Sequence, residues 1–327
     1  MENNSDHNIS FIKYSGIDSL DKYYETISII GSGSFGVVFK AKCLSDGCLW
    51  AVKKTERTKT NYIQWELHLM TIIKHKNIVS IKELIETDKY SFMVMELCSG
   101  GSLKDQFNKC GQFSETELKH IMMQFVDALR YLHNRNIAHR DLKMENLLLQ
   151  SVQNPKKNTG NDNRFSNYLI KLIDFGLSVQ LKMNQEMMVE YCGTPLYMPP
   201  EIIRGKSYSK QCDIWSMGIV MYTLMLGKKP FHSCENLTES ILNFNINSDP
   251  LPCELGSFSE KSIEALRGLL NPDPSYRYSA SELFHHSWLT GADQKESINV
   301  LLLMKQMANS KRTTNLSLKP TAALTNQ

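Results

Sequence analysis

The sequence has no apolar run long enough to cross a membrane. Its longest, around Ile214–Leu226, is short and interrupted, whereas a spanning helix needs about 20 apolar residues. The start of the chain has no basic segment followed by an apolar core, so no secretory leader is visible. We therefore expect no membrane partner and a cytoplasmic location, with the nucleus as the alternative.

Paired metal-binding or redox cysteines are also missing. None of the eight cysteines forms a Cys-x-x-Cys pair, which argues against zinc-ribbon and thioredoxin classes and favours reduced thiols. Charge of one sign is scarce too, because 37 basic and 34 acidic residues leave a net charge of only +3. That surplus lies in residues 296–327, which carry four basic residues and one acid. We therefore expect no nucleic-acid partner.

The residues that are present predict an α+β protein with two lobes. Before residue 98, glycine and Asp-Gly turns separate short β-rich runs, and a helical pattern interrupts them near residues 61–74. After Gly100-Gly101 the pattern becomes helical, and Ser114-x-x-Glu117 is a capping box at the start of an amphipathic helix. The predicted lobes are residues 24–98 and 99–289. The predicted strands are residues 26–30, 36–41, 48–53 and 92–97.

Three segments do not fit this core. Residues 1–23 are polar and are predicted to form a flexible extension. Residues 150–168 are rich in asparagine and are predicted to be a mobile loop inserted in the larger lobe. Residues 290–327 form a mixed tail that is either regulatory or disordered.

A glycine-rich segment is the first chemical signal. Residues 31–36 read Gly-Ser-Gly-Ser-Phe-Gly between two predicted strands. Glycines let backbone N–H groups approach phosphate oxygens. The alternative is a flexible hairpin. Because the segment does not open a helix, it argues against a dinucleotide-binding fold.

A lysine and a glutamate form the second signal. Lys53 lies on an apolar strand, where its ammonium needs an anion. Glu66 lies on the following helix, between Leu67 and Ile63 on the face expected to point inward. A pair between them would hold the ammonium at a phosphate. The alternatives are a solvent-facing lysine and a solvated helix charge.

Two further segments place charge between apolar runs. Residues 139–146 read His-Arg-Asp-Leu-Lys-Met-Glu-Asn and lie between the apolar stretches 129–137 and 147–149. Asp174 follows an apolar strand and precedes Phe175-Gly176, which suits a metal-binding carboxylate on a turn. The alternatives are a charged turn and a simple turn.

Together these four motifs resemble the eukaryotic protein-kinase family, in family order. Residues 192–201 and 213–218, with Arg277 before His286-Ser-Trp288, support the resemblance, which covers residues 24–289. It implies a two-lobed protein-kinase fold, and we expect a monomer. It also implies ATP and Mg²⁺ as cofactors and serine or threonine hydroxyls of proteins as substrates.

The resemblance assigns roles to individual residues. Lys53 would bind the α- and β-phosphates and Glu66, and Asp141 would accept the proton of the substrate hydroxyl. Lys143 is typical of serine/threonine kinases and would touch the transferred phosphate, with Thr194 nearby. Asn146 and Asp174 would hold Mg²⁺. The residues implied to line the nucleotide cleft are Gly31, Ser32, Gly33, Ser34, Phe35, Gly36, Val38, Ala51, Met95, Glu96, Cys98, Glu145 and Leu148.

Several positions depart from the family pattern. Glu190 stands where many relatives carry a phosphorylated threonine, and Arg140 would normally bind that phosphate. A carboxylate there predicts activity without phosphorylation of the activation loop; the alternative is a solvated glutamate. Ser102 and Thr223 replace acids common in kinases that select basic residues, so this selectivity is predicted to be weak, although Glu145 remains. Pro199 replaces the usual alanine of Ala-Pro-Glu.

The subfamily and the competing functions complete the predictions. Residues 174–178 and 285–289 resemble the calmodulin- and calcium-dependent kinases, whereas residues 222–231 have polo-like features. The apolar-basic tail segment 300–312 predicts a calmodulin-like partner. The rival function is a pseudokinase-type binding scaffold; the presence of Lys53, Asp141, Asn146 and Asp174 argues against it.

Overall fold

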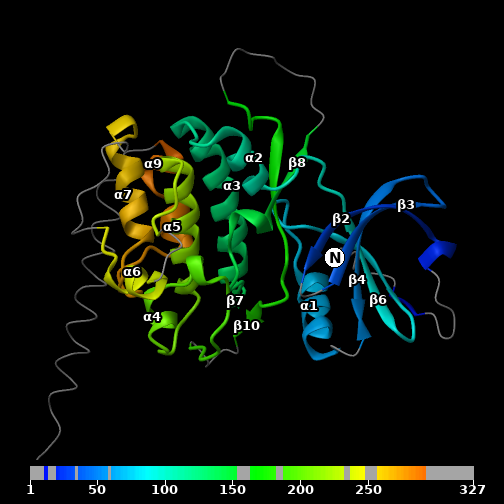
Figure 1. The fold of residues 1–327 in the computed structure, drawn as a ribbon. Helices are drawn as coiled ribbons and strands as arrows, with labels where there is room; N and C mark the ends of the chain where they lie inside the picture. Colours follow the sequence, from blue (N-terminus) through cyan, green and yellow to red (C-terminus); the bar gives the residue numbers. More distant parts are fainter. Residues whose placement is uncertain are drawn as a thin grey trace, which may run out of the picture.

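The smaller lobe is built on a six-stranded sheet in the order β1-β5-β6-β4-β3-β2 (Figure 1). The computed structural model describes residues 11–13, 20–33, 36–57, 60–152, 163–181, 187–231, 236–246 and 256–291. Neighbouring strands are antiparallel except β1 and β5, which are parallel. The elements are β1 (Phe11–Lys13), β2 (Tyr24–Gly33), β3 (Gly36–Cys43), β4 (Leu49–Glu56), α1 (Thr60–Ile72), β5 (Ile81–Glu86) and β6 (Tyr90–Glu96).

The larger lobe is mostly helical (Figure 1). Its helices are α2 (Leu103–Cys110), α3 (Glu115–His133), α4 (Pro200–Ile203), α5 (Gln211–Leu226), α6 (Leu237–Asn243), α7 (Glu260–Leu269), α8 (Ala280–Phe284) and α9 (Ser287–Thr290). Its short strands are β7 (Ile137–Ala138), β8 (Leu147–Ser151), β9 (Tyr168–Leu172) and β10 (Val179–Gln180). The predicted order, a sheet lobe followed by a helical lobe, is confirmed.

The two lobes share apolar packing through α1. Leu69 and Met70 near the end of this helix, and Ile73 just after it, belong to the same buried cluster as the core of the larger lobe. Leu67 packs instead with Leu84 and Met93 of the sheet. Helix α1 therefore contacts both lobes, and its position depends on both.

Helix α5 is the centre of the larger lobe. It is apolar almost all round and buried along its whole length, which is the pattern of a core helix. Trp215 is fully buried there. No helix among the described residues is long and apolar enough to span a membrane.

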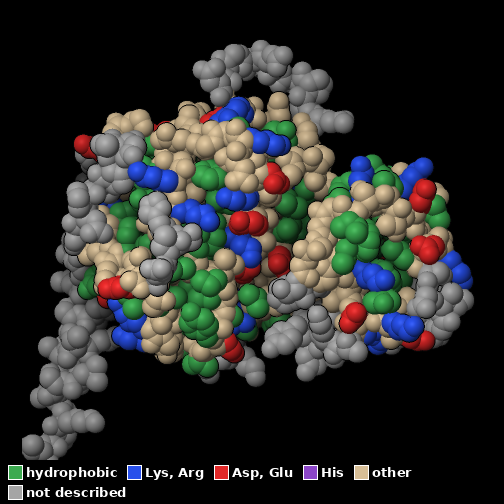
Figure 2. Space-filling view, viewed as in Figure 1, with side chains coloured by type: hydrophobic (Ala, Val, Ile, Leu, Met, Phe, Trp, Pro, Cys, Tyr) green, Lys and Arg blue, Asp and Glu red, His purple; other side chains and the backbone are tan. Residues whose placement is uncertain are grey.

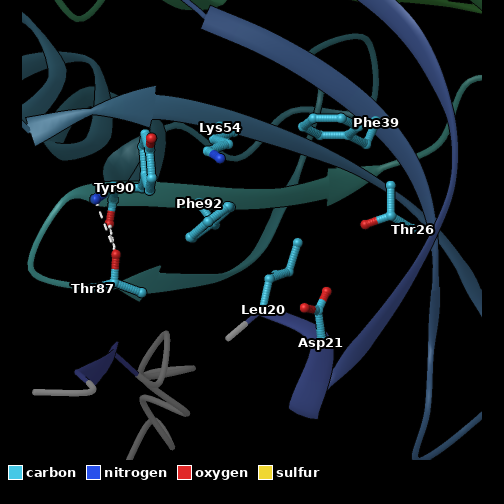
Figure 3. A pocket seen from close by; sticks show the side chains of 8 residues that line it. All are labelled: Leu20, Asp21, Thr26, Phe39, Lys54, Thr87, Tyr90 and Phe92. Atoms are coloured by element: carbon cyan, nitrogen blue, oxygen red, sulfur yellow. Dashed lines mark hydrogen bonds between the residues drawn. The ribbon is translucent and has the colours of Figure 1, made fainter. Parts of the chain in front are cut away.

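The six-stranded sheet of the smaller lobe carries a small hollow on the face away from α1 (Figure 3). Successive strand residues point to opposite faces, so Lys54 lies on the face away from its neighbour Lys53 and from α1. Its ammonium lies 3.7 Å from the centre of the Tyr90 ring. The hollow measures about 170 Å³ and is lined by Leu20, Asp21, Thr26, Phe39, Lys54, Thr87, Tyr90 and Phe92.

The prediction of a flexible extension over residues 1–23 is wrong for two segments. Phe11–Lys13 forms β1 and pairs with β5. Leu20 begins a 3-10 turn and is buried against the outer face of the sheet. Residues 1–10 and 14–19 lie outside the described residues.

The prediction of a mobile loop over residues 150–168 is wrong at both ends. Gln150 and Ser151 belong to β8, which pairs with β9. Phe165 is buried and stacks on Phe113 with ring centres 5.1 Å apart. Arg164 pairs with Glu117 at 2.5 Å. Residues 153–162 lie outside the description, as do residues 292–327 of the predicted tail.

Candidate active site

The glycine segment forms the turn between β2 and β3. Gly33 pairs with Gly36 at the end of the strand ladder. Gly36 has φ of 130°, and a Cβ atom there would lie 2.1 Å from the carbonyl oxygen of Lys54. Only glycine fits this position, so the backbone of Gly36 packs closely against β4. Ser34 and Phe35, predicted to cover the nucleotide, lie outside the described residues.

Lys53 and Glu66 form a buried ion pair between β4 and α1. The ammonium lies 2.7 and 2.9 Å from the two carboxylate oxygens. It also lies 3.8 Å from Oδ1 of Asp174 in the larger lobe. The structure therefore brings these three residues together, and the lysine ammonium faces the cleft between the lobes.

The loop that carries Asp141 is held by the buried carboxylate of Asp213 on α5. Its two oxygens accept from the backbone N–H groups of His139 and Arg140 at 2.9 and 2.8 Å. One of them also lies 2.9 Å from Nε2 of His133. Burial alone would raise the pKa of Asp213, but the hydrogen bonds and His133 lower it. The ionised carboxylate fixes two consecutive amides, which holds Arg140 at φ of 68°.

Asp141 is the centre of a compact polar group. Its Oδ2 lies 2.6 Å from the Lys143 ammonium, and its Oδ1 accepts from the Thr194 hydroxyl at 2.6 Å. Lys143 also donates to the Thr194 hydroxyl at 3.0 Å. Burial would raise the pKa of Asp141, but Lys143 and Thr194 lower it below its ordinary value. The carboxylate is therefore ionised at neutral pH and can accept a proton.

Asn146 and Asp174 offer oxygen atoms suited to Mg²⁺. Asn146 donates its amide nitrogen to the carbonyl oxygen of Asp141 at 2.9 Å, which leaves its amide oxygen for another partner. Oδ1 of Asp174 is buried and has no hydrogen-bond partner among the described residues. Mg²⁺ prefers carboxylate and other oxygen ligands. The two residues therefore fit the predicted metal ion.

The residues predicted around the adenine come from four strands. Ala51 of β4 is paired with Met95 of β6, and Val38 of β3 is paired with Lys53. Leu148 lies on β8, half-buried in the larger lobe. The strand register therefore brings Val38, Ala51 and Met95 onto neighbouring strands beside Lys53.

The segment joining the lobes contains a contact that the sequence analysis missed. The carboxylate of Glu96 accepts from Lys171 at 2.9 Å and from the backbone of Ser80 at 2.7 Å. The Glu96 side chain is therefore engaged with β9, and its backbone N–H donates to the carbonyl oxygen of Ser80 at 3.1 Å. Burial, with Glu96 adding to it, raises the pKa of Cys98 to about 12, so this thiol stays protonated.

Glu145 lies on the 3-10 turn Met144–Asn146 and is exposed. Tyr197 lies in the activation segment, which is the stretch from Asp174 to Glu201. Burial and the nearby charge of Glu145 raise the pKa of Tyr197. The structure therefore places Glu145 next to the activation segment.

His139 is a packed side chain. It is fully buried, and its ring meets that of Phe175 edge-on at 5.0 Å. Its Nε2 lies 3.0 Å from the carbonyl oxygen of Ile173. Phe175 belongs to the same buried cluster as Met70 of α1, so the position of His139 agrees with a structural role.

Arg140 anchors the activation segment at two points. Its Nε donates to the carbonyl oxygen of Leu177 at 2.6 Å, and its Nη1 lies 3.1 Å from the Glu190 carboxylate. Tyr208, which the sequence analysis did not single out, donates to the backbone carbonyl of Glu190 at 2.7 Å. The Glu190 side chain is 66% exposed, so the pair lies at the surface.

The remaining departures from the family pattern lie in structural positions. Ser102 caps α2 and bonds with Asp105. Thr223 is fully buried and donates to the carbonyl oxygen of Ile219 at 2.7 Å, so it faces the core. Pro199 precedes α4 in extended backbone with φ of −77°, which proline adopts without strain.

Figure 2 shows a notch where the two lobes meet, with basic and acidic side chains on the adjoining edge of the larger lobe. The sheet supplies a glycine turn and a lysine, and the helical lobe supplies a carboxylate, a lysine and two oxygen ligands. This set defines the class of ATP-dependent phosphotransferases.

Comparison with known proteins assigns the family. The protein kinase domain family matches residues 24–289, and the chain belongs to this family. Serine/threonine-protein kinase 33 is 37% identical over 302 residues in Mus musculus and in Bos taurus, covering 89% of this chain and 60% of either relative. A probable serine/threonine-protein kinase, fhkD, of Dictyostelium discoideum is 33% identical, covering 84% of this chain and 38% of that protein.

Myosin light chain kinase A of Dictyostelium discoideum is 30% identical over 302 residues, covering 90% of this chain and 97% of that protein. The chain thus spans about 60% of the length of the first relatives. The predicted resemblance to eukaryotic serine/threonine kinases similar to the calmodulin-dependent group is confirmed. Members of the family use ATP, typically with Mg²⁺.

Proposed function

We propose that this chain transfers the γ-phosphoryl group of ATP to serine or threonine hydroxyls of protein substrates. The observation that carries this proposal is the group around Asp141. Its carboxylate is ionised and is held between Lys143 and Thr194. A substrate hydroxyl beside Asp141 can give up its proton to this carboxylate as it attacks the phosphorus atom.

The other residues position the nucleotide and balance its charge. Lys53, fixed by Glu66, binds the α- and β-phosphates, and the backbone of the glycine turn covers them. Lys143 lies beside the acceptor carboxylate, where its ammonium stabilises charge on the transferred phosphate. Asn146 and Asp174 hold Mg²⁺, which when bound neutralises charge on the phosphates.

The test measures phosphate transfer from Mg-ATP to an array of serine and threonine peptides. The samples are the full chain, its Asp141→Asn variant and a truncation that ends at Leu289. Loss of a general base typically costs 10²- to 10⁴-fold, so Asp141→Asn should lose activity by about that factor. Nucleotide binding without transfer by the full chain would favour the binding-scaffold function. Higher activity in the truncation would mean that the tail inhibits the chain, and would justify a search for a calmodulin-like partner of that tail.

We also propose that Glu190 replaces activation-loop phosphorylation. The support is its 3.1 Å contact with Arg140, whose Nε bonds to Leu177 in the same segment. The pKa of Glu190 is lowered by backbone N–H groups and by Arg140, so the side chain is ionised at neutral pH. Exposed pairs contribute at most about 1 kcal/mol, so Glu190→Gln should lower the rate of the unphosphorylated chain about two- to fivefold. An unchanged rate and unchanged protease protection of the segment would contradict this role.

A further inference from the structure

Trp65 links α1 to the activation segment. This residue directly precedes Glu66, and its indole Nε1 donates to the backbone carbonyl oxygen of Ser178 at 2.8 Å. The indole is on the rim of the molecule, 36% exposed. Its N–H group can only donate, so the bond depends on the Ser178 carbonyl oxygen being held in place in the larger lobe.

That acceptor is fixed by the larger lobe. Ser178 is 2% exposed, its hydroxyl bonds to the carbonyl oxygen of His139 at 3.3 Å, and its backbone N–H bonds to the carbonyl oxygen of Phe175 at 3.0 Å. The preceding carbonyl, that of Leu177, accepts from Arg140. The segment that follows Asp174 is therefore held by His139 and Arg140, in the loop that carries Asp141. Trp65 attaches α1 to this segment.

Two consecutive residues of α1 thus make contacts in different directions. Glu66 reaches Lys53 in the sheet, and Trp65 reaches the activation segment. Neighbouring helix residues are about 100° apart around the axis, so the two contacts together restrict rotation of the helix. A helix turned away from this position would separate Glu66 from Lys53.

We propose that Trp65 is a positioning residue for phosphate transfer: its indole N–H holds α1 so that Glu66 orients Lys53, and it connects this pair to the segment anchored by Arg140 and Glu190. This inference rests on the proposed kinase function. It adds one specific contact, the bond from Trp65 to Ser178, between the helix that carries Glu66 and the segment after Asp174.

The test removes the N–H group and keeps most of the ring. Trp65→Phe should lower kcat about fivefold, which corresponds to about 1 kcal/mol, with a smaller change in KM for the peptide. Trp50→Phe is the matched control, because the Trp50 indole nitrogen is buried in the same lobe and has no hydrogen-bond partner among the described residues. It should leave kcat unchanged. Equal kcat values for Trp65→Phe and the unmodified chain would overturn the proposal.

Hydrogen exchange provides a second readout that needs no catalysis. In Trp65→Phe the backbone amides of residues 175–181 should exchange several-fold faster than in the unmodified chain and in Trp50→Phe. Unchanged exchange would overturn the proposal, even if the chain showed no phosphate transfer at all. Faster exchange in a chain without transfer would support the coupling and contradict only the proposed function.

A double-mutant cycle tests the connection to Glu190. If the two residues act through the same segment, Trp65→Phe and Glu190→Gln together should reduce kcat by less than the product of their separate effects. Independent, multiplicative effects would contradict that connection. Thermal unfolding of each variant checks that the changes in kcat do not follow a loss of folded protein.

Discussion

Thr194 forms two hydrogen bonds with Asp141. Both the hydroxyl and the backbone N–H of Thr194 donate to Oδ1 of Asp141, at 2.6 and 3.1 Å. This places the activation segment directly against the proposed catalytic carboxylate. The position of the segment and the ionisation of Asp141 are therefore linked.

Thr194→Val should shift the pH dependence of activity. Removal of the hydroxyl removes one of the interactions that lower the pKa of Asp141, so that pKa should rise. Since the ionised form accepts the proton, the acidic limb of kcat/KM should move to higher pH. Because Lys143 still lowers this pKa, the carboxylate should remain ionised at neutral pH, and the loss of activity should be confined to the acidic limb. Thr194→Ser, which keeps the hydroxyl, should retain the original profile; a shift in both variants would contradict this explanation.

Asp213→Asn should lower the free energy of unfolding, and the size of this loss should depend on pH. The folded-state pKa of Asp213 lies below its ordinary value, which in an unfolded chain is about 3.9. Its stabilising contribution is therefore complete well above that pH and is lost as the pH falls toward the folded pKa. Urea unfolding should show Asp213→Asn less stable at pH 7, with the difference shrinking toward pH 3. A difference that stayed constant over this range would show that ionisation of Asp213 is not the cause.

The buried pair Glu201–Arg277 should show strong coupling. Arg277 is fully buried and donates to both oxygens of Glu201, at 2.6 and 2.7 Å. Removal of one partner leaves an uncompensated charge, which costs about 3–5 kcal/mol. We expect Arg277→Met to lose about that much stability in urea, and the double variant with Glu201→Gln to lose much less than the sum of the two single changes. Simple additivity would contradict the pairing.

Phe165→Ala should destabilise the larger lobe without changing its chemistry. The side chain is 2% exposed and stacks on Phe113, and such substitutions cost about 3–5 kcal/mol. Val152→Ala at the other end of the insertion is the control, because Val152 is 38% exposed and should change stability by less than about 0.5 kcal/mol. Similar losses for both variants would mean that Phe165 is not the anchor. Activity of the folded fraction should remain unchanged in both.

The sequence predicts those parts of the site that depend on local spacing. Lys53, Asp141 and Asp174 lie in short motifs next to apolar strands, and the structure brings them to one cleft; their chemical roles stay predictions. The link between Trp65 and Ser178 joins residues 113 positions apart. Nothing in the local pattern around an exposed tryptophan indicates such a partner.

The missed parts of the fold have a similar cause. Strand β5 contains Lys82 and Glu83, which obscure its alternation. In the folded sheet the Lys82 ammonium lies 4.5 Å from the centre of the Trp50 ring, and Glu83 accepts from the hydroxyl of Tyr24. Phe165 is also misjudged from its local sequence, because the asparagine-rich residues around it predict a loop whereas its side chain is buried against Phe113. Long-range partners decide these positions, and composition alone does not reveal them.

The ladder of β8 and β9 separates the insertion from the cleft. At one end it pairs Leu147 with Leu172, next to the two residues proposed to bind Mg²⁺. At the other end, the N–H of Val152 donates to the carbonyl oxygen of Asn167 at 2.8 Å. The chain between Val152 and Asn167 can therefore be lengthened, shortened or replaced by a foreign peptide while the distance between the metal-binding residues stays the same. Lengthening a closed loop costs little free energy. This makes the insertion a suitable place to add a new binding sequence without altering the proposed active site.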